Sequence, residues 1–370
     1  MGILFLFLSS NVVLAQKNLI QRLLSNEKDT TRKASFLPVP LFGYAQETGF
    51  EFGLGGLYSF FVDKKDTINR SSNFFGAAYY TTKKTYNIGF DGDAWTKGNR
   101  YHLISELKYR KTPFNFYGTG NETIALNEDK LVQKLIRIAF DVEKKIFPFS
   151  YTGLSVAFDN QQFTDDVEDG IFQALSTTKH GGSILFFGVS QSYDTRNSNN
   201  YPTKGFFGRV SYQYAPAIFG EENFRGSQIK LNLRNFWTIS PKIVLGTQAL
   251  LHTVKGSLIP FYVLPQMGND EMMRGYYTGR YRDENLLASQ AELRYRFTNR
   301  LGVVGFAGIG KVFANGDFSF QQLKPNYGLG GRYFFDTAKG LSLRLDYGIG
   351  EKKPNEDRQK GIYIGLAEAF

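Results

Sequence analysis

Residues 341–350, LSLRLDYGIG, alternate strictly between apolar and polar positions. The apolar positions are Leu341, Leu343, Leu345, Tyr347 and Ile349, and between them stand Ser342, Arg344, Asp346, Gly348 and Gly350. A period of two is that of a β-strand. The alternating run is longer than the about 5–6 residues usual in soluble sandwiches. It matches the about 9–11 residues that a tilted strand needs to cross a membrane, so we predict a spanning strand with a lipid face and a lumen face.

The same two-sided pattern recurs along the chain, most clearly at 136–143, 229–234 and 292–297. Sixteen strands are expected, near 37–46, 50–62, 74–81, 85–95, 100–111, 130–146, 151–158, 182–193, 206–215, 227–238, 241–252, 288–297, 300–312, 326–335, 340–350 and 360–370. An even number of strands places both chain termini on one side of the membrane.

The connections between these strands alternate in length. Short turns are expected at 96–99, 147–150, 298–300 and 336–339, and long loops at 112–129, 159–181, 253–287, 313–325 and 351–359. Short periplasmic turns opposite long outer loops are typical of outer-membrane barrels. The predicted fold class is all-β: a transmembrane antiparallel up-and-down β-barrel of about 16 strands.

Composition excludes several other classes. The 370 residues include 39 Gly, 35 Phe and 22 Tyr but no Cys. The mean hydropathy of −0.30 is too polar for a bundle of apolar spanning helices. Without cysteine, disulfides cannot stabilise an exported chain. The net charge of +10 fits contact with anionic outer-membrane lipids better than a nucleic-acid partner in a barrel of this kind.

The N-terminal residues indicate export. An apolar run at 3–8 is followed by Val13, Leu14 and Ala15, which place small or branched residues before a secretory cleavage site at Gln16. Residues 1–15 are therefore expected to be a signal peptide, 16–36 a short periplasmic segment, and 37–370 the barrel.

The long connection 253–287 contains the sequence GNDEMMRGYYTGRYRD at 268–283. At this point the chain resembles the BamA/TamA-type outer-membrane assembly-factor superfamily, also called bacterial surface antigens. In that family the sixth outer loop folds back into the lumen and carries an Arg-Gly-Tyr/Phe tip. The matching residues here are Arg274, Gly275 and Tyr276, followed by the supporting loop residues Arg282 and Asp283.

The resemblance also implies a partner for the tip arginine. The following strand of the family carries an inward acid, and Glu292 stands at that position. Strand alternation supports this, because Leu293 takes the lipid side and leaves Glu292 toward the lumen. A buried guanidinium needs such a carboxylate, since an unpaired charge removed from water is strongly destabilising. The family often adds an Asp on the next strand, where this chain has Gly308, so a single ion pair is expected.

Two further features resemble the same family. Residues 194–196 and 201–205 are similar to its turn between the eighth and ninth strands. The chain ends on Phe370, expected in the same outward register as Ile362, Ile364 and Leu366, which is the pattern of a C-terminal barrel signal. Glu368 interrupts that register.

The resemblance implies insertion or translocation of protein or lipid at the outer membrane of a bacterium. Family members capture clients with periplasmic repeats for which 16–36 leaves no room. We therefore expect periplasmic or lipoprotein partner subunits, with unfolded outer-membrane proteins as clients. A passive channel or structural subunit is the alternative.

An enzyme is not expected, and no cofactor is implied. The three His residues, His102, His180 and His252, show no metal-ligand spacing and no Ser/His constellation stands near them. The glycines at 53–56 and 328–331 lie inside expected strands rather than in a phosphate-binding loop. The acidic run 165–169 is read as a solvated loop face.

Overall fold

The computed structural model describes residues 25–26, 31–45, 49–165, 170–174, 181–220 and 223–370. Its sixteen long strands are β1 (Ser35–Ala45), β2 (Gly49–Phe61), β3 (Ser71–Thr81), β4 (Tyr86–Trp95), β5 (Tyr101–Phe116), β6 (Asp129–Phe147), β7 (Ser150–Asp165), β8 (Gly181–Asp194), β9 (Gly205–Ala215), β10 (Arg225–Ser240), β11 (Ile243–Ser257), β14 (Asn285–Arg296), β15 (Leu301–Phe313), β16 (Lys324–Asp336), β17 (Leu341–Ile349) and β18 (Lys360–Leu366). Two short strands, β12 (Gln266–Met267) and β13 (Tyr281–Arg282), lie in one loop.

Helical structure is limited to short segments in the described part of the chain. Two 3-10 turns occur, η1 (Lys97–Asn99) and η2 (Ala125–Asn127). No described helix is long and apolar enough to span a membrane. The expected signal peptide, most of 16–36 and most of the acidic run 165–169 lie outside the described residues.

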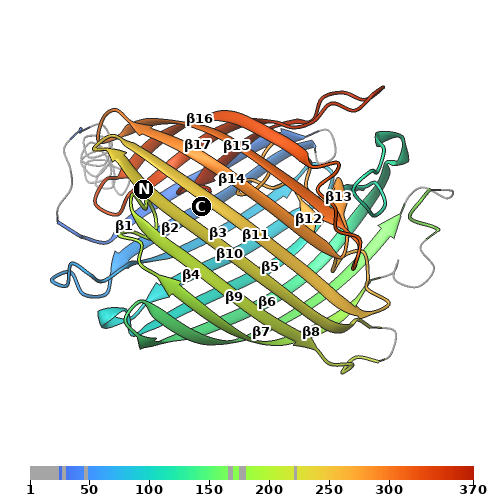
Figure 1. Ribbon diagram of the computed structural model, residues 1–370, viewed down its shortest axis with the longest axis horizontal. Coiled ribbons are helices and arrows are strands. Elements are labelled where there is room, and N and C mark those ends of the chain that lie inside the picture. Colours follow the sequence, from blue (N-terminus) through green and yellow to red (C-terminus); the bar gives the residue numbers. More distant parts are fainter. Residues whose placement is uncertain (1–24, 27–30, 46–48, 166–169, 175–180, 221–222) are drawn as a thin grey trace, which may run out of the picture.

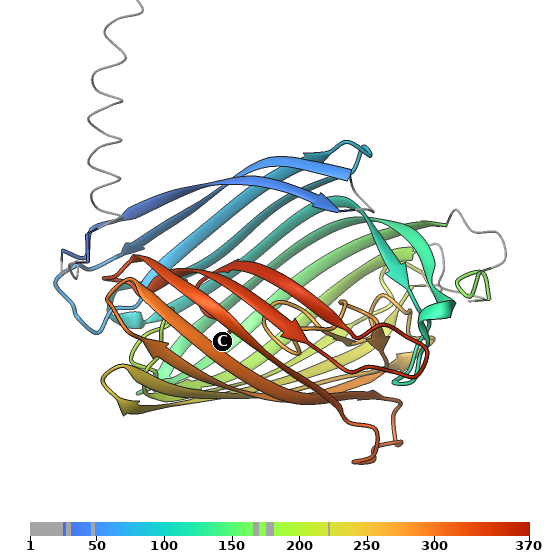
Figure 2. The same ribbon diagram turned by 90° about the horizontal axis from the view of Figure 1, so that it is seen from above.

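The long strands form one antiparallel sheet in chain order, with β11 followed directly by β14. The sheet curls round an interior, with its strands strongly tilted (Figure 1). Within the described residues β1 pairs only with β2 and β18 only with β17, so these two strands are the edges of the sheet. Figure 2 shows the two edges as the blue and red ends of the colour series. The predicted sixteen-strand up-and-down architecture is confirmed.

One end of the gap between the edges, here called the seam, is bridged by side chains. The Ser35 hydroxyl donates to Asp336 Oδ2 at 2.7 Å. Lys339 Nζ lies 2.7 Å from the same carboxylate oxygen and also donates to the Lys33 carbonyl at 2.7 Å. These contacts, named the seam clasp for Ser35, Asp336 and Lys339, tie the start of β1 to the turn between β16 and β17.

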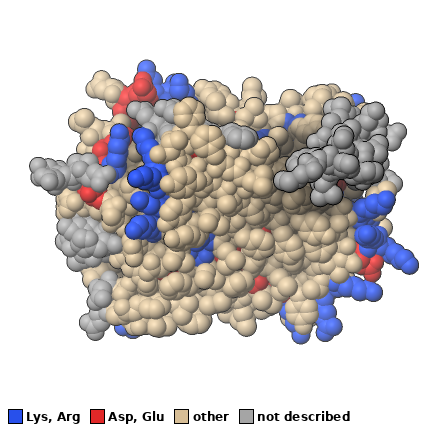
Figure 3. Space-filling model, turned by 180° about the vertical axis from the view of Figure 1, so that it is seen from behind, with Lys and Arg blue, Asp and Glu red and all other residues tan. Residues whose placement is uncertain are grey.

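Alternation separates the two faces of the sheet as predicted. On β17, Leu343 and Leu345 are 41% and 54% exposed, whereas Arg344 and Asp346 are buried on the inner face. Charged side chains gather at the two ends of the molecule, with a largely uncharged band between them (Figure 3). Such a band is what a hydrocarbon layer requires of the outer surface. Leu341 differs from expectation because an irregular register at the β16–β17 turn buries it.

Several strands extend beyond their predicted outer ends. β7 runs to Asp165 rather than 158, and β5 runs to Phe116 rather than 111. Both strands stay paired with β6 over this extra length. Paired backbone groups favour continuation of the ladder past the apolar band, which alternation of apolar residues alone does not report.

The turn between β8 and β9, residues 195–204, crosses the end of the interior. Asn199 Nδ2 donates to the Ser71 carbonyl at 2.9 Å, and Asn73 Nδ2 donates to Asn200 Oδ1 at 2.9 Å. Asn200 Nδ2 also donates to the Lys339 carbonyl at 3.0 Å. Because β3 and the β16–β17 turn are far from β8 in the sheet order, the turn must reach across the lumen.

Candidate functional site

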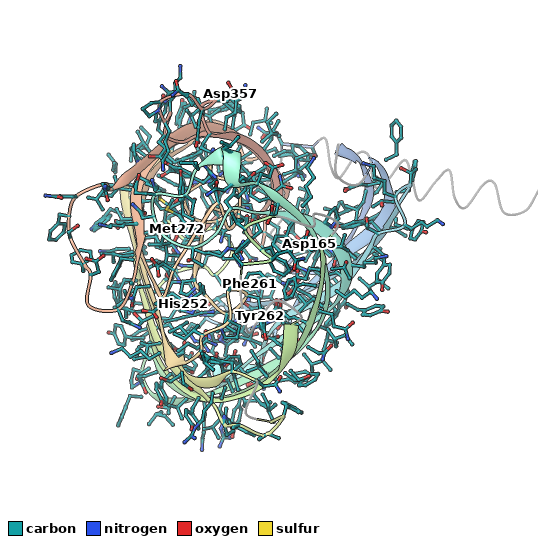
Figure 4. All side chains as sticks on the ribbon, turned by 90° about the vertical axis from the view of Figure 1, so that its right-hand side faces the viewer. Asp165, His252, Phe261, Tyr262, Met272 and Asp357 are labelled. Atoms are coloured by element: carbon teal, nitrogen blue, oxygen red, sulfur yellow. The ribbon has the colours of Figure 1, made fainter. Side chains whose placement is uncertain are left out.

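The sixth outer connection, residues 258–284, folds into the lumen as predicted. In Figure 4, viewed from the end of the barrel that carries this loop, Phe261, Tyr262 and Met272 lie inside the ring of strands. Residues of the loop pack with residues of β14 and β15 in one apolar cluster. Its members are Met267, Met272, Met273, Tyr276, Tyr281, Leu286, Ala288 and Val312. Burial of each large side chain contributes about 1.5–3 kcal/mol, which favours the inward conformation of the loop.

Arg274 stands at the tip of this loop and is completely buried. One of its terminal nitrogens contacts Glu292 of β14, and the other lies 2.6 Å from Asp346 Oδ2 of β17. The guanidinium carbon sits 3.6 Å from the centre of the Phe306 ring. Asn326 Nδ2 donates to the Arg274 carbonyl at 2.9 Å. The tip arginine therefore links two strands of the inner wall through charge-assisted hydrogen bonds.

The two carboxylates belong to a larger ion cluster. Glu292 also lies 2.9 Å from Arg294, and Asp346 contacts both Arg332 and Arg344. The members of this tip cluster are Arg274, Arg294, Arg332, Arg344, Asp270, Glu292, Asp346 and Glu368. Four cations thus face four carboxylates, and this balance lets charged groups remain buried without a net uncompensated charge.

Gly275 allows the tip to reach the wall. Its φ of +113° lies in a region that residues with a side chain rarely adopt. A Cβ at this position would stand 2.7 Å from the Ile349 carbonyl carbon and 2.8 Å from the Gly350 nitrogen. The wall leaves matching room at Gly348, where a Cβ would stand 2.6 Å from the Arg274 carbonyl carbon. Backbone packs directly on backbone here, so both surfaces require glycine.

Tyr276 and the edge strand hold the tip from two sides. The buried Tyr276 hydroxyl donates to the Pro325 carbonyl at 2.6 Å and accepts from the Glu351 amide at 3.0 Å. Burial raises the pKa of this hydroxyl, which keeps it protonated and able to donate. Tyr363 of β18 accepts from the Gly275 amide at 2.8 Å and donates to the Tyr276 carbonyl at 3.3 Å. The loop tip is thus bonded directly to a strand at the seam.

The expectation of a single ion pair is wrong, because Asp346 supplies a second carboxylate from β17. Gly308 lies on β15, where the family pattern led us to look for an acid. Its neighbours leave no space for one, since a Cβ would lie 2.7 Å from the Ser289 carbonyl oxygen and 2.6 Å from Asn326 Oδ1. The sequence did carry a signal for Asp346, which is the inward acid of the strand at 341–350. The sequence alone did not show that Asp346 contacts Arg274.

Introducing the family's acid by Gly308→Asp is expected to lower the free energy of unfolding by about 1–3 kcal/mol, because the surrounding backbone must shift. Denaturant unfolding of the detergent-solubilised protein measures this loss. The pair Gly308→Ala and Gly331→Ala isolates the steric part, since a Cβ at Gly331 meets no atom within 4 Å. A Gly308→Asp protein as stable as the wild type would contradict this explanation.

The supporting loop residues occupy different surroundings. Arg282 is buried between aromatic rings, and its hydrogen bonds go to the Gly279 carbonyl. The Asp283 carboxylate accepts from the Glu284 amide at 2.8 Å. These two neighbours do not form an ion pair with each other in the described structure.

Phe370 does not face outward. β18 ends at Leu366, Ala367 adopts a φ of +63°, and the chain turns into the lumen. The buried Glu368 carboxylate lies 2.7 Å from Arg332, and the Phe370 ring packs 6.0 Å from that of Phe236 on the inner face of β10. The predicted outward register was wrong from residue 367 onward, because the inward arginines attract Glu368. A role for Phe370 as a barrel signal stays a prediction.

The outer part of the loop is held by other loops, which the sequence did not reveal. Arg280 Nη2 lies 2.9 Å from Glu356 Oε2 and donates to the Thr123 carbonyl at 3.1 Å. The Gly120 amide donates to the Arg282 carbonyl at 2.7 Å. Pairs between separate loops leave no periodic signal in a single sequence, so they appear only once the loops are placed.

The turn that resembles the family's eighth-to-ninth connection forms an ion cluster of its own. Asp194 lies 2.8 Å from Arg196 and 3.0 Å from Arg70. These contacts join β8, its turn and the start of β3.

Comparisons with known proteins identify a family profile and solved structures that match this chain. The profile of the Omp85 superfamily domain matches residues 41–370. BamA from Haemophilus ducreyi lacking POTRA domains 1-3 shares 10% identity at a TM-score of 0.56, over 96% of this chain and 77% of that chain. CdiB from Acinetobacter baumannii shares 14% identity at a TM-score of 0.54, over 90% of this chain and 59% of that chain.

CdiB from Escherichia coli shares 12% identity at a TM-score of 0.55, over 90% of this chain and 62% of that chain. This chain therefore spans about three-fifths of the CdiB chains that it matches. No curated protein sequence gives a significant match. The structural similarities support the fold, and the profile covers nearly all of the sheet. The chain belongs to the Omp85 superfamily, a family of outer-membrane β-barrel proteins.

Proposed function

We propose that this protein resides in the bacterial outer membrane and inserts proteins into that membrane or translocates them across it, together with partner subunits. The observation that carries the proposal is the position of the tip cluster. Arg274 is locked to β14 and β17, and the adjacent Gly275 is bonded to Tyr363 of the edge strand β18. A locked loop therefore supports one edge of a sheet whose edges are not paired with each other.

Unpaired strand edges support a role in handling other β-strands. An edge strand presents backbone amides and carbonyls that can pair with an incoming strand. In a membrane such groups are costly if left unpaired, which favours their use or protection. At one end of the seam, the seam clasp ties the edge strand β1 to the β16–β17 turn through Ser35, Asp336 and Lys339. This arrangement suits a seam that opens for a client strand and closes afterwards.

A passive channel is less consistent with the contents of the lumen. The loop 258–284 occupies the interior, the turn 195–204 crosses one end, and residues 367–370 fold inward beside Phe236. A sixteen-strand sheet has a lumen wide enough for water, so its obstruction by three segments argues against steady conduction.

The test is a reconstitution of the full chain in lipid vesicles with an unfolded outer-membrane β-barrel protein as client. The wild type is expected to accelerate folding of the client at least about tenfold over empty vesicles, and to show small, brief conductance in planar bilayers. No acceleration together with large, steady openings would overturn the proposal in favour of a channel.

Because the chain has no Cys, an introduced pair can lock the seam without side reactions. Ser35→Cys with Asp336→Cys replaces two groups that lie 2.7 Å apart. The oxidised protein is expected to lose its effect on client folding and to regain it on reduction, while each single variant serves as a control. An oxidised pair that remains fully active would show that opening at this end of the seam is not needed.

A further inference from the structure

A cavity of about 500 Å³ lies between the loop 258–284, the outer part of β5–β7 and the start of β18. Seven aromatic residues line it: Phe114, Phe163, Phe261, Tyr262, Tyr276, Tyr277 and Tyr363. The lining also includes Arg110 and Arg282, with Lys360 at its edge, but no Asp or Glu among the described residues. The cavity therefore combines cationic groups with aromatic walls and lacks an internal anion.

Arg282 is the buried cation of this cavity, with only 2% of its surface exposed. Its guanidinium carbon lies 5.2 Å from the Phe116 ring centre and 5.6 Å from that of Phe261. Both of its hydrogen bonds, each 3.2 Å long, go to the Gly279 carbonyl. Within the described structure no carboxylate lies within 4.0 Å of it. Burial lowers its pKa to about 10, so it remains a cation at neutral pH.

Arg110 adds a second cation without a carboxylate. Its Nη2 donates to Gln133 Oε1 at 2.8 Å, and its buried Nε has no partner. Several other lumen arginines do have carboxylate partners. Arg137, for example, lies 2.7 Å from both Glu106 and Asp159. Two cations of this cavity therefore lack the carboxylate partners that Arg137 has.

We propose that this cavity binds a soluble phosphate ester or the phosphate headgroup of a lipid, with the phosphate held by the cationic side chains between the aromatic walls. A guanidinium pairs well with phosphate oxygens, and a buried cation without a carboxylate partner gains most from such an anion. The cavity is of the size of a small-molecule site and therefore fits a headgroup rather than a complete lipid. It also borders β18, the edge strand at the seam.

The test measures binding to the full chain in neutral detergent by native mass spectrometry. Three probes separate the contributions: dioctanoyl phosphatidic acid, glycerol 3-phosphate without the acyl chains, and dioctanoylglycerol without the phosphate. Phosphatidic acid is expected to bind at a single site. Equal affinity for glycerol 3-phosphate would identify the source as a soluble phosphate ester, whereas binding of the phosphatidic acid alone would identify a lipid headgroup.

Arg282→Gln is expected to weaken phosphatidic acid binding at least tenfold. Arg225→Gln is the matched control, because Arg225 is exposed at the start of β10 and does not line the cavity. If Arg282→Gln does not fold, Arg110→Gln takes its place with the same expected loss. The proposal is overturned if neither phosphate probe binds, if dioctanoylglycerol binds as tightly as phosphatidic acid, or if the folded cavity variants retain wild-type affinity.

Discussion

Replacing Arg274 with alanine is expected to lower the free energy of unfolding by about 3 kcal/mol and to abolish activity in client folding. Removing one partner of a buried ion pair costs about 3–5 kcal/mol. The loss falls at the lower end because Arg294 still contacts Glu292 and Arg332 still contacts Asp346. Denaturant unfolding in detergent and the vesicle assay measure the two effects.

Arg137→Ala is the matched control for this prediction. Arg137 also bridges two carboxylates, but its side chain is 29% exposed, and both partners lie on strands of the wall, β5 and β7. Ion pairs in contact with water contribute about 0–1 kcal/mol to stability, so Arg137→Ala is expected to lower the free energy of unfolding less than Arg274→Ala does. A double-mutant cycle of Arg274→Ala with Asp346→Ala should show coupling. Wild-type behaviour of both Arg274→Ala and Glu292→Ala would refute the role given to the tip.

Gly275→Ala should be as damaging as the loss of the arginine itself, although it removes no charge. The added Cβ would collide with the backbone at Ile349 and Gly350, so the tip cannot seat and Arg274 loses both carboxylates. Trypsin is expected to cut the loop at Arg274 or Arg280 in this variant, whereas both are buried in the wild type. Limited proteolysis and thermal unfolding together measure the undocking.

Gly316→Ala separates collision from backbone strain. Gly316 has a φ of +87°, and a Cβ there meets nothing within 4 Å. Both substitutions incur the about 1–2 kcal/mol of a left-handed residue with a side chain, but only Gly275→Ala should expose the loop. Adding Arg274→Ala to Gly275→Ala should cause little further loss. Equal protease resistance of the two glycine variants would show that the close approach at Gly275 is not required.

The sixteen strands were predictable because each one must separate lipid from lumen with a period of two. That requirement is local, so the pattern at 341–350 could be recognised without any knowledge of its neighbours. The pairing of Arg274 with Glu292 was also accessible, since the tip resembled a family motif and strand parity placed the acid inside. The predicted ends of the strands were less accurate, as for β7, because backbone hydrogen bonding between neighbouring strands continues beyond the apolar band.

The second carboxylate illustrates what the pattern could not provide. Parity showed that Asp346 faces inward, but its distance to Arg274 depends on the registers of β14 to β17 and on the path of the loop. The inward turn of Glu368 and Phe370 was missed for the same reason. Local alternation favoured an outward Phe370, whereas the position of Arg332 reversed it.

The sequence by itself determined that the chain forms a sixteen-strand sheet with an apolar outside and a charged inside, because side-chain alternation follows from strand geometry alone. It also identified the loop tip and one of its partners. Only the tertiary structure decided which charges meet, which cavity is left without an acid and which strands form the seam. Those properties depend on contacts between segments far apart in the chain, and such contacts are set by register and by the close approach of backbones.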